Sequence, residues 1–240
     1  MTQPATTLDA TTLDATTLDA TTDAALQGQV FQAVLFDLDG TLVDSTAAVN
    51  RSWLRWGAEA GLGPSYTGAE HGVPARQQIA ALVAEDLVEA SVARLTEFEL
   101  ADADGVTILA GAAELMAGIP EARRAIVTSC GRQLCLMRLD AAGFSAPLTV
   151  VTIDDTSRGK PFPEPFLLAA ERLGVDPSRC VVVEDAPAGL AAARAAGCAT
   201  IGVVGTHRAA ELEADLVVSG LDRLRVSVQP DGVVFHLVAE

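Results

Sequence analysis

The sequence predicts an α/β fold in which helices cover both faces of a parallel sheet. An apolar run ends at Phe36, and uninterrupted apolar runs are typical of strands that are buried on both faces. From about residue 111 onward, strand patterns and helix patterns alternate along the chain. Alternation of this kind indicates a doubly wound, Rossmann-like core with a parallel sheet.

The elements of this core follow from apolar periodicity and from the positions of glycine and proline. The patterns predict further strands at 124–131, 148–153, 180–183, 200–204 and 216–218, and helices at 111–119, 132–142, 166–173 and 188–196. Prolines at 161–165 should exclude a helix before residue 166. Alternating residues on both sides of a Pro-Asp-Gly turn at 230–232 predict a C-terminal β-hairpin, which we expect at a sheet edge.

The chain divides into three regions. Residues 1–27 contain repeats of Thr-Thr-Leu-Asp-Ala, a low-complexity pattern that fits no regular packing and predicts disorder or a weak local helix. Residues 45–107 carry helix formers at helical spacing and no convincing strand, which indicates a small α-helical insert after the first strand. The core then comprises residues 28–44 together with 108–240.

Composition restricts the possible partners. The net charge of −16 argues against nucleic acid and against anionic membranes, because like charges repel. No apolar run approaches the length of a membrane span. Four cysteines without a C-x-x-C pair or a zinc spacing predict reduced thiols in a cytoplasmic protein. Because the whole protein is negatively charged, an anionic substrate would need local cations at its binding site.

Reactive side chains follow several of the predicted strands. Asp37 and Asp39 come directly after the first strand, and a spacing of two residues on extended backbone points both carboxylates the same way. Gly40 lets the chain leave the strand without hindrance from a Cβ atom. The later strands end at, or lead into, Thr128 and Ser129, Lys160, and Glu184 and Asp185. Because ligands of parallel sheets bind beyond the carboxyl ends of the strands, these groups should converge there.

The motif Asp37-Leu38-Asp39-Gly40-Thr41 resembles the signature of the haloacid dehalogenase-like phosphohydrolases. The ordered succession of acid pair, hydroxyl, lysine and second acid pair is similar to that family too, and residues 34–234 look like its bacterial sugar phosphatases and β-phosphoglucomutase-like members. The resemblance implies that Asp37 attacks phosphorus and that Asp39 handles protons. It also implies that the helical insert is a cap domain. An acid at position 39 argues against the dehalogenase branch.

The expected chemistry requires a cation. A phosphate monoester brings up to two charges to a site with four carboxylates, so we expect Mg²⁺, which prefers hard oxygen ligands. The expected ligands are Asp37, Asp185 and the backbone carbonyl of Asp39, with Glu184 nearby or acting through water. Lys160 is expected to neutralise a phosphoryl oxygen, and hydroxyls of Thr128 or Ser129 to donate to others.

The helical insert should supply substrate selection. His71 and Arg76 lie in or after a turn between its helices, where they could contact the sugar. Cys130 stands where the family is expected to have a small polar residue or glycine.

We therefore predict a Mg²⁺-dependent phosphatase of small sugar or polyol phosphates that works through an aspartyl-phosphate. A sugar phosphomutase is the alternative, since it forms the same intermediate and returns the phosphoryl group to a second hydroxyl. A phosphoacceptor signalling module and a non-catalytic sugar-phosphate-binding protein are remoter alternatives. The individual substrate and the choice between monomer and dimer stay open.

Overall fold

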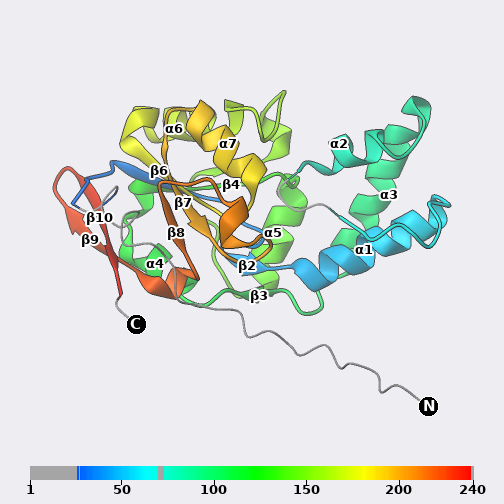
Figure 1. Cartoon of the computed structure of the whole chain (residues 1–240), viewed down its shortest axis with the longest axis horizontal. Coiled ribbons are helices and arrows are strands. Elements are labelled where there is room, and N and C mark those ends of the chain that lie inside the picture. The colour runs from blue at the N-terminus through cyan, green and yellow to red at the C-terminus, as the bar shows by residue number, and fades with distance from the viewer. Residues whose placement is uncertain (1–25, 27, 70–72, 239–240) are drawn as a thin grey trace, which may run out of the picture.

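The computed structural model of the chain describes residues 26, 28–69 and 73–238 (Figure 1). The predicted disorder of the Thr-Thr-Leu-Asp-Ala repeats lies outside these residues, and so does His71. Leu26 was assigned to the low-complexity tail, and that assignment is wrong: its side chain packs into the main core with 5% of its surface exposed. Burying an apolar side chain of this size stabilises the fold, so Leu26 contributes to the core.

A six-stranded parallel sheet forms the centre of the molecule. Its spatial order is β5 (Val150–Val151), β4 (Arg124–Val127), β1 (Ala33–Phe36), β6 (Cys180–Glu184), β7 (Ala199–Val203) and β8 (Leu216–Val218). Strand β1 therefore pairs with β4 on one side and with β6 on the other. The carboxyl ends of these three strands lie next to one another, at the position where doubly wound sheets bind ligands.

Helices cover both faces of the sheet, as the alternating patterns predicted (Figure 1). Val34 and Phe36 pack on the face covered by α4 (Ala112–Gly118) and α5 (Arg132–Ala141). Ala33 and Leu35 pack on the opposite face, against α6 (Glu164–Leu173) and α7 (Pro187–Ala195). Successive side chains of β1 point to opposite faces and all four are fully buried, which explains why an unbroken apolar run marks this strand.

The helical insert is present after β1. It begins and ends at two short antiparallel strands, β2 (Val43–Asp44) and β3 (Thr107–Ile108). Between them lie α1 (Thr46–Glu59), α2 (Ala75–Ala80) and α3 (Val88–Ala101), which have an apolar cluster of their own. Trp53 and Trp56 share one face of α1, with ring centroids 5.8 Å apart in an edge-to-face arrangement. The insert lies to one side of the sheet in Figure 1.

Three expectations about the core need correction. The hairpin of β9 (Leu224–Gln229) and β10 (Gly232–Leu237) forms its own two-stranded sheet instead of extending the main sheet. Helix α6 begins at Glu164, because Pro165 in the first helical turn lacks only an N–H that has no helical partner there. Strand β5 is shorter than the predicted 148–153, since Leu148 at its start is 83% exposed.

Short 3₁₀ helices complete the connections, at Glu85–Leu87, Glu121–Arg123, Ile153–Asp155, Pro177–Arg179, Ala209–Glu211 and Leu221–Arg223. Within the described part of the chain, none of the helices has the length and apolar character that crossing a membrane requires.

Candidate active site

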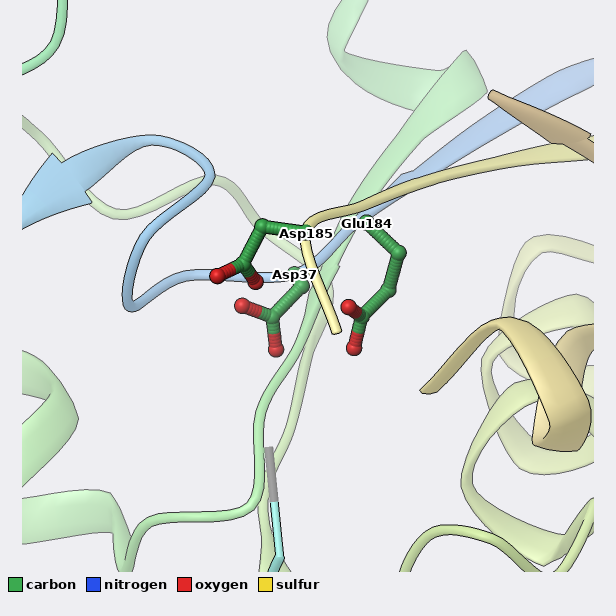
Figure 2. Close-up of side chains that lie close together, drawn as sticks. All are labelled: Asp37, Glu184 and Asp185. Atoms are coloured by element: carbon green, nitrogen blue, oxygen red, sulfur yellow. The ribbon is translucent and has the colours of Figure 1, made fainter. Parts of the chain in front are cut away.

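Three buried carboxylates meet at the carboxyl ends of β1 and β6. One oxygen each from Asp37, Glu184 and Asp185 lies within 4.8 Å of the other two. Figure 2 shows the three side chains gathered where the two strands end. The strands are held together up to this point, because the backbone N–H of Asp37 donates to the carbonyl of Val183 at 2.9 Å. The parallel sheet thus brings together acids that are almost 150 residues apart in the sequence.

Lys160 lies among these acids. Its ammonium donates to Asp37 and, at 2.9 Å, to Oε1 of Glu184, while only 1% of its side chain is exposed. Burial acts against the charge of Lys160, but the carboxylates of Asp37 and Glu184 outweigh burial and raise its pKa. The ammonium therefore stays charged and compensates one of the three carboxylates.

Among the described residues, no second side-chain cation pairs with these three carboxylates. Burial is the main effect that raises the pKa of Asp37; Lys160 opposes it, and Glu184 and Asp185 add to it. Burial followed by the charge of Glu184 raises the pKa of Asp185 to about 8. A divalent cation would relieve both effects, and a cluster of carboxylate oxygens is a donor set that suits Mg²⁺. The residues present therefore fit a Mg²⁺ ion.

Glu184 is fixed in its position. Its Oε2 accepts a hydrogen bond from the backbone N–H of Ala186 at 2.6 Å, and its Oε1 accepts from Lys160. Helix α7 passes so close that a Cβ atom at Gly189 would lie 1.7 Å from Oε1 of Glu184. Only glycine fits there, so the helix and the lysine together set the direction of this carboxylate.

Asp185 is held by two threonine hydroxyls. Thr41 donates to its Oδ1 at 3.3 Å, and Thr206 donates to its Oδ2. Gly40 has a φ of 88°, and a Cβ atom there would lie 2.2 Å from Oδ2 of Asp185. The glycine in the Asp37–Thr41 motif is thus needed both for its left-handed backbone and for the close approach of Asp185.

Asp39 has a different set of partners. Its Oδ1 accepts from the hydroxyl of Ser45 at 2.7 Å, and its Oδ2 accepts from Nη1 of Arg138 at 2.8 Å. Nη2 of Arg138 donates to Glu99 of α3 at 3.0 Å. Burial acts against the charge of Arg138, but the neighbouring carboxylates outweigh it and raise its pKa. Burial also raises the pKa of Glu99, against the opposing effect of Arg138.

A cavity of about 440 Å³ opens between the core and the helical insert above these groups. Its core side includes Asp37, Asp39, Thr128, Ser129 and Arg138, and its insert side includes Trp53, Arg76, Gln78, Thr96 and Glu99. Thr128 is buried, and its hydroxyl accepts from the backbone N–H of Cys130 at 3.2 Å. The cavity thus joins the acidic cluster to a wall formed by the insert.

The two residues expected to select the sugar have different outcomes. Arg76 lies at the start of α2 and lines the cavity, but its guanidinium is paired with Glu89 and largely exposed. His71 lies outside the described residues. Contact of either residue with a substrate remains a prediction.

The comparison with known proteins decides the family. The family described as haloacid dehalogenase-like hydrolase matches residues 31–197, which is more than half of the chain. The chain belongs to the haloacid dehalogenase-like hydrolases. Hexitol phosphatase A of Escherichia coli (strain K12) is 40% identical over 210 residues, covering 83% of this chain and 96% of the relative. Validoxylamine A 7'-phosphate phosphatase of Streptomyces hygroscopicus subsp. limoneus is 36% identical over 208 residues, covering 82% and 97%.

A solved structure of similar fold supports this architecture. A hydrolase from Pseudomonas syringae superposes with a TM-score of 0.73 and 25% identity, covering 80% of this chain and 94% of that chain. The resemblance seen in the sequence to the haloacid dehalogenase-like hydrolases, and the fold that it implied, are both confirmed.

Several residues of this haloacid dehalogenase-like site were not found from the sequence. Thr206 follows β7 by three residues, so the rule that parallel strands present ligands at their carboxyl ends could have found it. Arg138 and Glu99 offered no such signal, because each lies within a helix and reads as an ordinary solvated charge. Ser45 reads as a residue of the turn before α1.

Proposed function

We propose that this hydrolase is a Mg²⁺-dependent phosphatase that acts on small sugar or polyol phosphates. The observation that carries the proposal is the cluster of Asp37, Glu184 and Asp185 around Lys160. Through Asp37 this cluster reaches a cavity shared by the core and the helical insert. By name, the two curated relatives named above are a hexitol phosphatase and a phosphatase of validoxylamine A 7'-phosphate. Both support a phosphatase, and the first supports a polyol phosphate as the substrate.

The acidic cluster would hold the metal. Asp37 and Asp185 would be ligands through carboxylate oxygens, the carbonyl of Asp39 would add a third oxygen, and Glu184 would act nearby or through water. When bound, Mg²⁺ supplies positive charge that offsets the carboxylates and the phosphate of the substrate.

The reaction itself uses two carboxylates of this chain. An oxygen of Asp37 attacks phosphorus in line, so that an Asp37–phosphorus bond forms while the bond to the leaving oxygen breaks. Asp39 gives its proton to the leaving oxygen, and then takes a proton from the water that hydrolyses the aspartyl-phosphate. Lys160 has three N–H groups and uses two of them on Asp37 and Glu184, which leaves the third for a phosphoryl oxygen.

The other end of the substrate would contact the helical insert, which we propose acts as a cap. Trp53 offers an apolar face to the cavity, and Gln78 and Thr96 offer polar groups. A polyhydroxylated substrate presents both hydroxyls and C–H surface, which such a wall can contact. The cavity lining carries three arginines and four carboxylates, and Arg76 and Arg138 are already paired with carboxylates. The attraction for an anionic substrate would therefore come from Lys160 and the metal ion.

The experiment is a panel of hexitol, glycerol and hexose phosphates, incubated with the full-length protein and Mg²⁺ while free phosphate is measured. We expect phosphate release from members of the panel, and none from Asp37→Asn. Each sugar phosphate reaction is also analysed for an isomeric sugar phosphate. Formation of an isomeric sugar phosphate without free phosphate would show that the protein is a mutase and not a phosphatase. An inactive protein with the native circular dichroism spectrum would contradict both activities.

A further inference from the structure

Arg138 connects the proton-handling residue of the core to the helical insert. It lies in α5, and only 5% of its side chain is exposed. Its two terminal nitrogens have separate partners: Nη1 donates to Asp39 at 2.8 Å, and Nη2 donates to Glu99 of α3 at 3.0 Å. One guanidinium therefore contacts the site and the insert at the same time.

Asp39 is held at both of its oxygens by groups that lead to the insert. The oxygen that Arg138 does not contact accepts from Ser45 at 2.7 Å, and Ser45 is the residue directly before α1. The first helix of the insert and, through Glu99, the third helix thus both have a connection to Asp39. Both oxygens of this carboxylate are therefore hydrogen-bonded to groups that adjoin or contact the insert.

We propose that Arg138 is a positioning residue that aims Asp39 at the leaving oxygen and links that aim to the helical insert through Glu99. The inference rests on the proposed function, because it is there that Asp39 transfers a proton. Proton transfer requires the acid to lie within hydrogen-bonding distance of the leaving oxygen. A displacement of the acid by about 1 Å therefore lowers the reaction rate strongly.

The geometry of arginine matters here. A planar guanidinium fixes the angle between its two terminal nitrogens, whereas the ammonium of lysine is a single point charge on a flexible chain. A buried and a partly buried carboxylate that share one buried cation, as Glu99 and Asp39 do, contribute little net stability, because desolvation offsets most of their attraction. The arrangement of Asp39, Arg138 and Glu99 is therefore better explained by the positions that it fixes than by the stability that it adds.

The test uses two aryl phosphates that differ in their need for an acid. Phenyl phosphate releases a basic phenolate, which requires a proton, whereas 2,4-dinitrophenyl phosphate releases a stable anion that leaves without one. Both lack sugar hydroxyls, so substrate recognition by the insert does not enter the comparison. We would measure kcat/KM of wild type, Arg138→Lys and Ser45→Ala on both substrates with Mg²⁺. The control is Arg172→Lys, since Arg172 pairs with Asp155 and with the carbonyl of Val150 and does not line the cavity.

For Arg138→Lys we expect a loss of roughly 10- to 100-fold on phenyl phosphate and a change of less than about threefold on 2,4-dinitrophenyl phosphate. Ser45→Ala should show the same selective loss, and Arg172→Lys should show none. Equal losses on both substrates in a variant with the native circular dichroism spectrum would overturn the positioning role alone. A wild-type protein that releases phosphate neither from these two substrates nor from any member of the sugar and polyol phosphate panel would overturn the proposed function, and the role of Arg138 with it.

Glu99 provides the second half of the test. If Glu99 acts only through Arg138, then Glu99→Gln should lower kcat/KM for phenyl phosphate in the wild-type background. The same substitution should leave kcat/KM unchanged in the Arg138→Lys background. Additive losses in this double-mutant cycle would show that Glu99 acts on its own, and would overturn the proposed link to the insert.

Discussion

Nζ of Lys160 lies 2.9 Å from Oε1 of Glu184, and both side chains are buried. The lysine that is expected to bind phosphate is thus already paired with two acids of the protein, Asp37 and Glu184. These ion pairs mean that Lys160 stabilises the buried acids of the folded protein, in addition to any contact with the substrate.

Replacing Lys160 should therefore affect stability as well as activity. Lys160→Met leaves three buried carboxylates without a cation, and we expect a loss of about 3–5 kcal/mol in unfolding free energy. Thermal unfolding without Mg²⁺ is the measurement. Lys160→Met/Glu184→Gln should recover part of that stability and no activity. A Lys160→Met protein with unchanged Tm would contradict the assigned ion pairs.

Asp37→Asn separates folding from chemistry. The amide is a poor nucleophile, so phosphatase activity should fall below a few per cent of wild type, a loss of roughly 10²-fold or more. Folding should survive, because burial raises the pKa of Asp37 and the substitution removes one member of a repelling group. On the same sample, circular dichroism measures folding and phosphate release measures activity. Activity near the wild-type level would remove Asp37 as nucleophile.

Mg²⁺ should stabilise the protein, and more strongly as the pH rises. The pKa of Asp185 is raised from 3.8 to about 8 in the folded state, so the native protein binds more protons than the unfolded chain between these values. The metal-free protein should therefore lose stability as the pH rises through this range. Mg²⁺ at about 100 times its Kd should restore about 2.7 kcal/mol.

Thermal unfolding with and without Mg²⁺ at acidic and at mildly alkaline pH tests this expectation. In the metal-free state at alkaline pH, Asp185→Asn should raise Tm by a few degrees, and it should abolish the Mg²⁺ shift. Asp231→Asn at the exposed hairpin turn removes the same charge, and it should neither raise Tm nor abolish the Mg²⁺ shift.

Activity measurements test the metal requirement separately. Activity that persists after dialysis against excess chelator would contradict this requirement. Ca²⁺ is expected to inhibit, because its coordination shell is larger and more variable.

Arg76 tests the selective role of the insert. Arg76→Ala should change kcat/KM for sugar or polyol phosphates by roughly tenfold, with little change for para-nitrophenyl phosphate, which lacks a sugar. Arg94→Ala, in an exposed ion pair of the insert, is the matched control. The same loss on every substrate would show that Arg76 does not select among them.

Much of the fold could be predicted from local patterns. Strand β1 is buried on both faces, so its apolar run was a reliable signal. The strand-end acids could be placed together because parallel strands share one edge. The start of α6 was wrong because a proline in the first turn was treated as a helix breaker. The hairpin was placed wrongly because alternation predicts a strand pair and does not predict where the pair packs.

The parts of the site that escaped prediction depend on tertiary contacts. Arg138 meets Asp39 and Glu99 across 99 and 39 residues of sequence, and no local pattern distinguishes a buried arginine on a helix from a solvated one. The same holds for the burial of Lys160, whose pairing with Asp37 and Glu184 follows from the fold and not from its neighbours in the chain.

Trapping the phosphorylated enzyme tests the central claim most directly. Asp39→Asn is mixed with 2,4-dinitrophenyl phosphate and Mg²⁺, because this substrate needs no acid to form the intermediate while hydrolysis of the intermediate still needs a base. We predict a burst of about one dinitrophenolate per protein molecule, followed by slow turnover, with the phosphoryl group found on Asp37 by peptide mass spectrometry after an acid quench. Steady release of dinitrophenolate without a burst, from a protein whose Asp37 stays unmodified, would contradict the account.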